Sequence, residues 1–437
     1  MSMMIRLIGV LVVLIALPAR AVDIQEVTSP GGTTYWLVEE PSIPIVSLEI
    51  SFLGGARLNP TGQEGLAKMF SALLDEGAGD LDAVAFANKR NDLSARFGFG
   101  AGRDALTVSA QMLVETMEPA AALLASALAD PRFDESSLER VRAQILSNLA
   151  EDETDPGAIA GKAWYAAAFP DHPYGIPQSG TPESVAALTR ADLVAAQPIL
   201  LNRANATVAI VGALDEAQAS ALIDTVMEGV AKGEAFQSEW AKVSPPPGIQ
   251  LIDLDVPQST AIFGHAGIKR TDPDFIPAFV MNYILGGGSF NSRLTEEVRE
   301  NRGLAYSVYS SMRVMDERAL FLGSVQTANE GMAESLEVIQ AEWSKMAEEG
   351  LSQADLEKAK KFLTGAFPLR FDSNAKIAGY LVFMQEAELG IDYLDTRNDL
   401  IEAVTLEQVN GAATRLLNPD GLSITVVGRP AGVEATR

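Results

Sequence analysis

The segment "LTRADLVAAQPILLNRANATVAIVG" (residues 188–212) has a counterpart 216 residues further on, "VTLEQVNGAATRLLNPDGLSITVVG" (residues 404–428). In both segments we expect an amphipathic helix that ends at Leu-Leu-Asn, followed by a β-branched strand that stops at glycine. The alignment needs no gap, because Thr189 matches Thr405 and both segments close on Val-Gly. The repeat predicts that the chain consists of two homologous halves.

The beginnings of the two halves agree in the order of their expected elements. Residues 45–77 and residues 258–288 each predict a strand, a turn marked by Gly or Pro, and a helix, which in the first half covers residues 65–77. Residues 93–113 and residues 305–327 each read as two strands joined by a short turn. Hairpins combined with long helices favour an α+β fold with two α/β sandwich domains, each a mixed, mostly antiparallel sheet covered by helices.

Domain boundaries follow from the repeat and from one proline-rich stretch. The segment "GEAFQSEWAKVSPPPG" (residues 233–248) contains three consecutive prolines, which cannot continue a helix and suit an extended linker. We therefore predict an N-terminal domain over residues 23–232 and a C-terminal domain over residues 249–430. A chain of 437 residues is long enough for two such cores.

The N-terminus carries the pattern of a signal peptide over residues 1–21. An early cation precedes an apolar run from Leu7 to Leu17, and Ala19-Arg20-Ala21 forms an A-x-A cleavage site. The alternative is a membrane anchor, but the apolar run is about half of the roughly 20 residues that span a bilayer. We expect a mature protein that has no stable membrane anchor and is exported. The absence of cysteine favours a periplasm-like compartment.

The charge balance excludes one class of partner. The chain has 33 Lys and Arg against 58 Asp and Glu, a formal net charge of −25. Such a surface repels phosphate backbones, so nucleic acid is not an expected ligand. An acidic surface is compatible with solubility alone, or with a mild preference for basic peptides or a basic partner.

Several short motifs are better explained by structure than by chemistry. The two histidines, His172 and His265, lie in different halves and cannot form a paired zinc site; we expect both to be structural. Ser373 and Lys376 match S-x-x-K without its companion motifs, and no G-x-S-x-G nucleophile elbow occurs. The glycine-rich "GFGAG" (residues 98–102) lacks the setting of a phosphate loop and suggests a flexible turn between two strands.

The most informative group of residues is "GGGSFNSRLTEEVRENRGLAYSVYSS" (residues 286–311). It combines a glycine hinge, a charged helix with Arg299, a turn at Gly303, and a strand that begins near Tyr306. Arg299 could also be a solvated helix charge and Tyr306 a half-buried strand residue, and the pattern by itself leaves both interpretations open.

At these residues the chain resembles the pitrilysin/insulinase family of zinc metallopeptidases, which includes mitochondrial processing peptidase and its catalytically silent relatives. The resemblance extends over essentially the whole mature chain. It is carried by "GGARLNPTGQEGLAKM" (residues 54–69), "FPDHPYGIPQSGTPESV" (residues 169–185) and "NSRLTEEVRENRGLAYSVYSS" (residues 291–311).

The family's metal motif is degenerate in this chain. Active members carry H-x-x-E-H, with two zinc-binding histidines one helical turn apart and a glutamate that acts as the base. At these three positions the chain has Lys68, Ser71 and Ala72, and the distal acidic ligand falls near Ser147 or Asn148. The resemblance therefore implies that this chain binds no metal and has no catalytic residues of its own.

The family's second-half pair is retained as Arg299 and Tyr306. The resemblance implies that the guanidinium holds a substrate carbonyl and that the phenol stabilises the oxyanion in the facing zinc site. We expect a non-catalytic subunit of an exported heteromeric zinc metallopeptidase, whose H-x-x-E-H partner chain supplies zinc and the base while this chain binds peptide. The alternative is a peptide-binding or structural protein of the same fold with no peptidase partner.

Overall fold

The computed structural model describes residues 23–240, 243–288 and 291–437. The predicted signal peptide over residues 1–21 lies outside this part of the chain. None of the helices in the described ranges is both long and apolar enough to cross a bilayer.

The first half is built on a six-stranded sheet. Its strands lie in the order β1 (Gln25–Thr28), β2 (Thr34–Glu39), β8 (Ala206–Gly212), β3 (Ile45–Leu53), β7 (Ala105–Leu113) and β6 (Arg96–Ala101). All neighbours are antiparallel except β2 and β8. Alternation along β3 places Leu48, Ile50 and Phe52 on the face that is covered by helices of the same half.

The second half repeats this sheet with one strand fewer. Its strands lie in the order β11 (Ala305–Val314), β12 (Ala319–Ala328), β10 (Gln258–Ala266), β13 (Ser423–Val427) and β9 (Gly248–Ile252). The single parallel pair, β13 with β9, corresponds to β8 with β2. The two predicted hairpins are present as β6–β7 and β11–β12. The predicted α+β class with two mixed, mostly antiparallel sheets is confirmed.

The sequence repeat is visible in two matched helices. Helix α7 (Arg190–Leu200) and helix α14 (Leu406–Leu416) are offset by 216 residues at both ends. Each begins after a threonine, Thr189 or Thr405, whose hydroxyl accepts a hydrogen bond from the third helical amide in a capping box. The same local signal therefore starts the same element in both halves.

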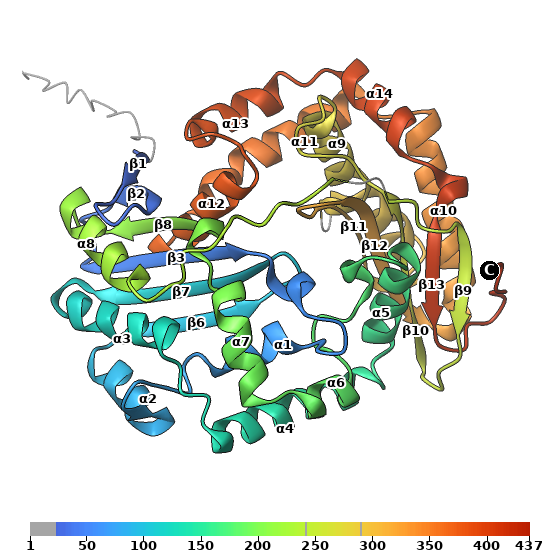
Figure 1. The fold of residues 1–437 in the computed structure, drawn as a ribbon. Helices are drawn as coiled ribbons and strands as arrows, with labels where there is room; N and C mark the ends of the chain where they lie inside the picture. Colours follow the sequence, from blue (N-terminus) through green and yellow to red (C-terminus); the bar gives the residue numbers. More distant parts are fainter. Residues whose placement is uncertain (1–22, 241–242, 289–290) are drawn as a thin grey trace, which may run out of the picture.

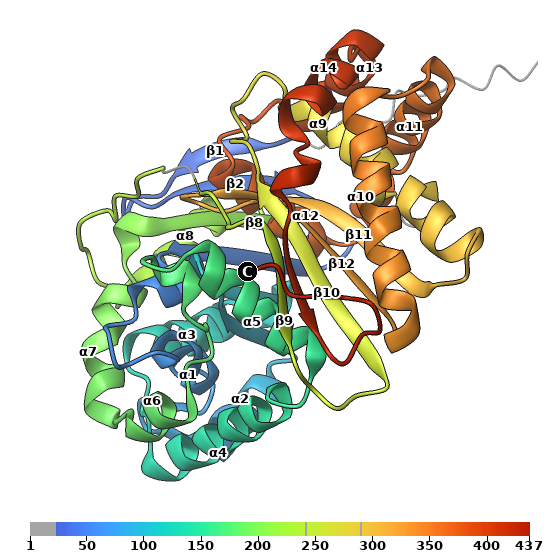
Figure 2. The ribbon, with the colours of Figure 1, turned by 90° about the vertical axis from the view of Figure 1, so that its right-hand side faces the viewer.

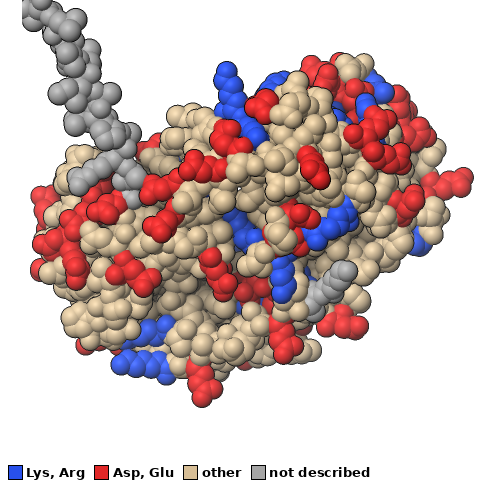
Figure 3. Space-filling model, turned by 90° about the horizontal axis from the view of Figure 1, so that it is seen from above, with Lys and Arg blue, Asp and Glu red and all other residues tan. Residues whose placement is uncertain are grey.

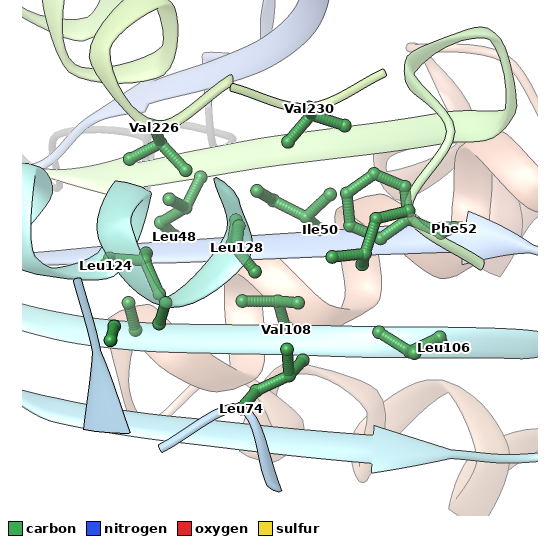
Figure 4. Close-up of a cluster of buried hydrophobic side chains, with 14 of the residues drawn as sticks. Leu48, Ile50, Phe52, Leu74, Leu106, Val108, Leu124, Leu128, Val226 and Val230 are labelled. Atoms are coloured by element: carbon green, nitrogen blue, oxygen red, sulfur yellow. The ribbon is translucent and has the colours of Figure 1, made fainter. Parts of the chain in front are cut away.

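Helices cover the outer face of each sheet. In the first half they are α1 (Leu66–Leu73), α2 (Ala83–Asp92), α3 (Met117–Ala129), α4 (Glu135–Asp152), α6 (Pro182–Ala187), α7 and α8 (Glu216–Met227). In the second half they are α9 (Phe275–Asn282), α10 (Met332–Glu348), α11 (Gln353–Gly365), α13 (Tyr393–Glu402) and α14. Figure 4 shows the core of the first half, where side chains from β3 and β7 meet those of α3 and α8.

The two halves exchange equivalent helices. Helix α5 (Pro156–Ala168) belongs to the first half but packs on β10 and β13, whereas helix α12 (Asn374–Glu386) of the second half packs on β3 and β8 (Figures 1 and 2). Trp164 of α5 is fully buried and donates its indole N–H to the carbonyl of Ser423 at 2.9 Å. Each sheet thus has its inner face covered partly by the other half, which holds the halves together.

Two local expectations were wrong. The helix expected over residues 65–77 ends at Leu73, and Gly77, at a φ of 110° that is incompatible with a helix, enters the short strand β4 (Gly77–Ala78). Residues 98–101 of "GFGAG" are not a turn and lie inside edge strand β6. The absence of a side chain at Gly98 suits the strand there, since a Cβ would lie 2.6 Å from Ser109 Oγ on β7.

Candidate functional site

The face of α1 that corresponds to a metal helix carries no group that could bind zinc. Lys68 is exposed, and its ammonium would repel a divalent cation. Ser71 is buried, and its hydroxyl donates to the Lys68 carbonyl at 3.0 Å. Ala72 has no donor atom. These three residues do not fit a zinc ion, so we derive no reaction step through a metal in this chain.

The positions expected for the distal ligand fit zinc no better. Ser147 and Asn148 are both exposed on α4, and the side-chain oxygen of Asn148 accepts a hydrogen bond from the amide of Gln144 at 2.9 Å. Within the described ranges, no three His, Cys, Asp or Glu side chains gather in a way that could hold a metal ion.

Both histidines make structural contacts. His172 accepts the backbone N–H of Tyr174 at its Nδ1 and contacts Glu317 at 2.7 Å through Nε2. His265 is buried, lies 3.2 Å from the indole nitrogen of Trp343, and has its pKa lowered by burial. Ser373 of the S-x-x-K match is the N-cap residue of α12. None of these groups is arranged as a nucleophile with its base.

Arg299 and Tyr306 are brought together by two irregular elements. Arg299 lies on the π-helical segment η7 (Thr295–Glu300), and Tyr306 lies on edge strand β11. The guanidinium carbon is 4.9 Å from the centre of the Tyr306 ring, a cation–π geometry. The register between β11 and β12 shifts from Ala305 to Ser307, so Tyr306 is the extra residue of a β-bulge. Its side chain is 83% exposed.

A buried polar contact fixes the strand beside this pair. Asn282, at the end of α9, donates to the Ser310 carbonyl at 3.2 Å and accepts from the Ser310 hydroxyl at 2.8 Å. The π-helical segment η5 (Tyr283–Gly287) follows Asn282 and packs against β11. A Cβ at Gly286 would lie 2.3 Å from Ser310 Oγ, so glycine permits this close approach.

The pair lines a pocket of about 620 Å³. All of its lining residues belong to the second half, and they include Tyr283, whose pKa is raised by burial. The side chains combine aromatic surface with two guanidinium groups, those of Arg299 and Arg370, and several hydroxyl groups, a lining that suits a peptide. Lys68, Ser71 and Ala72 do not line this pocket, so the structure places the two groups of predicted site residues apart.

A second pocket, of about 540 Å³, adjoins the first and shares Phe279, Met312 and Arg370 with it. It lies between the two halves, and its lining includes five arginines: Arg103, Arg270, Arg313, Arg370 and Arg397. No motif in the sequence predicts this pocket. Its residues come from widely separated segments, and no spacing in the sequence links them.

Comparisons with known proteins agree with the geometry. A family model described as the peptidase M16 inactive domain matches residues 187–363. The crystal structure of a peptidase M16 inactive domain from Pseudomonas fluorescens superposes with a TM-score of 0.88 and 31% identity, over 94% of this chain and 99% of that chain.

Two curated relatives are named differently, one as a non-peptidase and one as a zinc protease. The non-peptidase homolog YmxG of Helicobacter pylori is 27% identical over 91% of this chain and 92% of its own length. An uncharacterized zinc protease of Mycobacterium leprae is 27% identical over 92% of this chain and 91% of its own length. Given these matches and the degenerate face of α1, the chain belongs to the peptidase M16 family, the family of the pitrilysin/insulinase resemblance, as an inactive homologue.

Proposed function

We propose that this chain is the non-catalytic subunit of an exported heteromeric zinc metallopeptidase. A partner chain with an intact H-x-x-E-H motif supplies zinc and the general base. This chain binds the peptide substrate and contributes Arg299 and Tyr306 to the partner's active site. After removal of residues 1–21 the subunit acts in a periplasm-like compartment.

One observation carries the proposal: Arg299 and Tyr306 lie together at a pocket, whereas the face of α1 that corresponds to the metal helix has no side chain that could bind zinc. The bulge at Tyr306 supports this reading, since bulges often re-aim a side chain beside a site. Tyr306 is 83% exposed, so its hydroxyl can hydrogen-bond to water in the isolated chain and is accessible to a partner chain.

The two side chains suit complementary tasks in peptide cleavage. A guanidinium presents several N–H donors in one plane and can hold a substrate carbonyl. A phenol O–H can donate to the oxygen on which negative charge develops, an interaction that is stronger in the transition state than in the ground state. The 4.9 Å contact between guanidinium and ring holds the two donors side by side.

The test is a peptide-cleavage assay with the purified mature chain, alone and mixed with an H-x-x-E-H relative from the same genome. We expect no cleavage and no zinc in this chain alone, and a clear rise in the partner's rate on mixing. Arg299→Ala should reduce the stimulated rate about a hundredfold, and Tyr306→Phe about tenfold, while the complex still assembles.

Arg302→Ala is the matched control. Arg302 is a nearby arginine that pairs with Glu297 and does not line the pocket, so its loss should leave the stimulated rate unchanged. If Arg299→Ala and Arg302→Ala behave alike, or if mixing changes no rate, the complementing role is wrong.

The second candidate is a peptide-binding protein without a peptidase partner. It is favoured by the composition of the 620 Å³ pocket, which is complete within this chain. In that case the isolated chain binds peptides, no H-x-x-E-H chain co-purifies with it from the native organism, and Arg299→Ala alters peptide affinity alone.

A further inference from the structure

The pocket between the two halves has a charge opposite to that of the molecule as a whole. Its lining contains five arginines, named above, and one carboxylate, Asp104. The chain carries a net charge of −25. Figure 3 shows several Lys and Arg side chains near the middle of one face, with Asp and Glu beside them, whereas Asp and Glu are more numerous towards the two ends.

These arginines lack the carboxylate partners that most buried or clustered arginines have. Among the residues that the structure describes, none of the five forms an ion pair, although other arginines of the chain do. Burial lowers the pKa of Arg103; Tyr165 and Asp104 act in the opposite direction, and the charge of Arg313 lowers the pKa further. Five like charges thus lie around one pocket with a single carboxylate, Asp104, among them, which is costly unless an anion binds.

Aromatic rings stack on the planar faces of three of these guanidinium groups. The Arg103 guanidinium lies 4.0 Å from the Tyr165 ring centre, and that of Arg397 lies 4.0 Å from the ring of Phe367. Arg270 lies 4.6 Å from the ring of Phe275. Stacking occupies the face of a guanidinium and leaves its N–H edge available, and this edge matches a carboxylate in two parallel hydrogen bonds.

The N–H edges are only partly used by the protein. The Nε of Arg103 is buried with no hydrogen-bond partner among the described residues. Arg270 donates to the neutral hydroxyl of Tyr393 at 3.1 Å. Arg397 donates to the Leu363 carbonyl and to the side-chain oxygen of Asn398, both neutral acceptors. Donors remain for an incoming anion.

We propose that the pocket between the halves binds the carboxylate groups of an acidic peptide, with the aromatic rings packing on its apolar atoms. The pocket continues into the one that contains Arg299 and Tyr306 through Phe279, Met312 and Arg370. An extended peptide could therefore occupy both. The choice of a peptide as occupant rests on the proposed function; the carboxylate preference rests on the lining.

The test is fluorescence anisotropy with the mature chain alone and a labelled peptide in which glutamates alternate with glycine and phenylalanine. A matched peptide with lysine in place of glutamate is the charge control. We expect the acidic peptide to bind at least tenfold more tightly, with an affinity that falls as salt is raised. The double variant Arg313→Gln/Arg370→Gln, at two exposed positions, should weaken binding tenfold or more.

Arg429→Gln is the matched variant, because Arg429 pairs with Asp253 and Asp255 and lies outside the pocket lining. Equal binding of the two peptides, or unchanged binding by the double variant, would overturn the proposal. Inorganic phosphate that displaces the peptide at the peptide's own concentration would identify a small-anion site and also overturn it. Arg299→Ala separates the two proposals: it should reduce stimulation of the partner about a hundredfold, whereas the preference for the acidic peptide over the lysine peptide, which rests on the five arginines of the pocket between the halves, should remain.

Discussion

The two halves differ most where each presents its first helix beside its sheet. In the first half, α1 corresponds to a metal helix, but its motif positions hold the exposed Lys68, the buried Ser71 and Ala72, which packs against the core. In the second half, α9 leads into η5, and the candidate site residues Arg299 and Tyr306 lie on η7 and on the irregular strand β11. The fold preserves α1 through its buried residues, among them Met69 and Phe70. The comparison teaches that core packing can maintain this helix although its face carries no metal ligand.

The largest expected effect tests whether the halves are independent. Trp164→Ala should reduce the free energy of unfolding by about 3–5 kcal/mol, since it removes a fully buried indole that α5 inserts against the other half's sheet. Leu381→Ala, in the equivalent helix α12, should cost about 2–4 kcal/mol. Urea unfolding measures both.

Val194, which is 45% exposed on α7, provides the control, because Val194→Ala should change stability by less than about 0.5 kcal/mol. Because the halves exchange helices, we also expect one cooperative transition for the wild-type protein. Two separate transitions, with Trp164→Ala affecting one alone, would show that the halves fold independently.

The next effect concerns the corner that holds the Arg/Tyr pair. Asn282→Ala should cost about 2–3 kcal/mol, because it leaves both the carbonyl and the hydroxyl of Ser310 buried without their partner. Thermal unfolding would check this. Ser311→Ala, which removes a hydrogen bond from a half-buried hydroxyl to the Leu322 carbonyl, should cost clearly less. Equal costs would mean that Asn282 does not hold this corner.

The features of the two halves that could be predicted from the sequence are those that local sequence patterns encode. The 216-residue repeat, both hairpins and the seven-residue spacing of Arg299 and Tyr306 are readable in a single chain. The bulge at Tyr306 leaves no such signal, because it depends on pairing with β12. The exchange of α5 and α12 also depends on tertiary packing, since their amphipathic patterns do not say which sheet they cover. The arginine pocket joins residues as distant as Arg103 and Arg397.

A smaller, pH-dependent effect concerns the inner face of the first sheet. Burial, together with the nearby charge of Glu386, raises the pKa of Glu49 on β3 to about 7. The unfolded chain loses this proton near pH 4.3. The folded state therefore keeps a proton that the unfolded state has lost, and stability falls as the pH rises from about 4.5 to about 7.

Glu49→Gln removes this cost and should raise stability by about 1–2 kcal/mol at pH 8, after allowance for partial exposure, and by almost nothing at pH 4.5. Thermal unfolding across this range provides the measurement. Glu337→Gln, at an exposed position of α10, should show no such difference between the two pH values. A gain for Glu49→Gln that is the same at both pH values would exclude ionisation as its cause.

The smallest expected effect is at the former metal position itself. Lys68 is exposed and forms no ion pair with any residue in the described ranges, so Lys68→Ala should change the free energy of unfolding by less than about 0.5 kcal/mol.

The triple variant Lys68→His/Ser71→Glu/Ala72→His restores the H-x-x-E-H sequence, but α4 still has Ser147 and Asn148 where a third, carboxylate ligand would be needed. Zinc titration should therefore find weak binding or none, and cleavage should remain absent. Tight zinc binding by the triple variant would show that a third ligand exists nearby, and that the first half retains more of its chemistry than the face of α1 indicates.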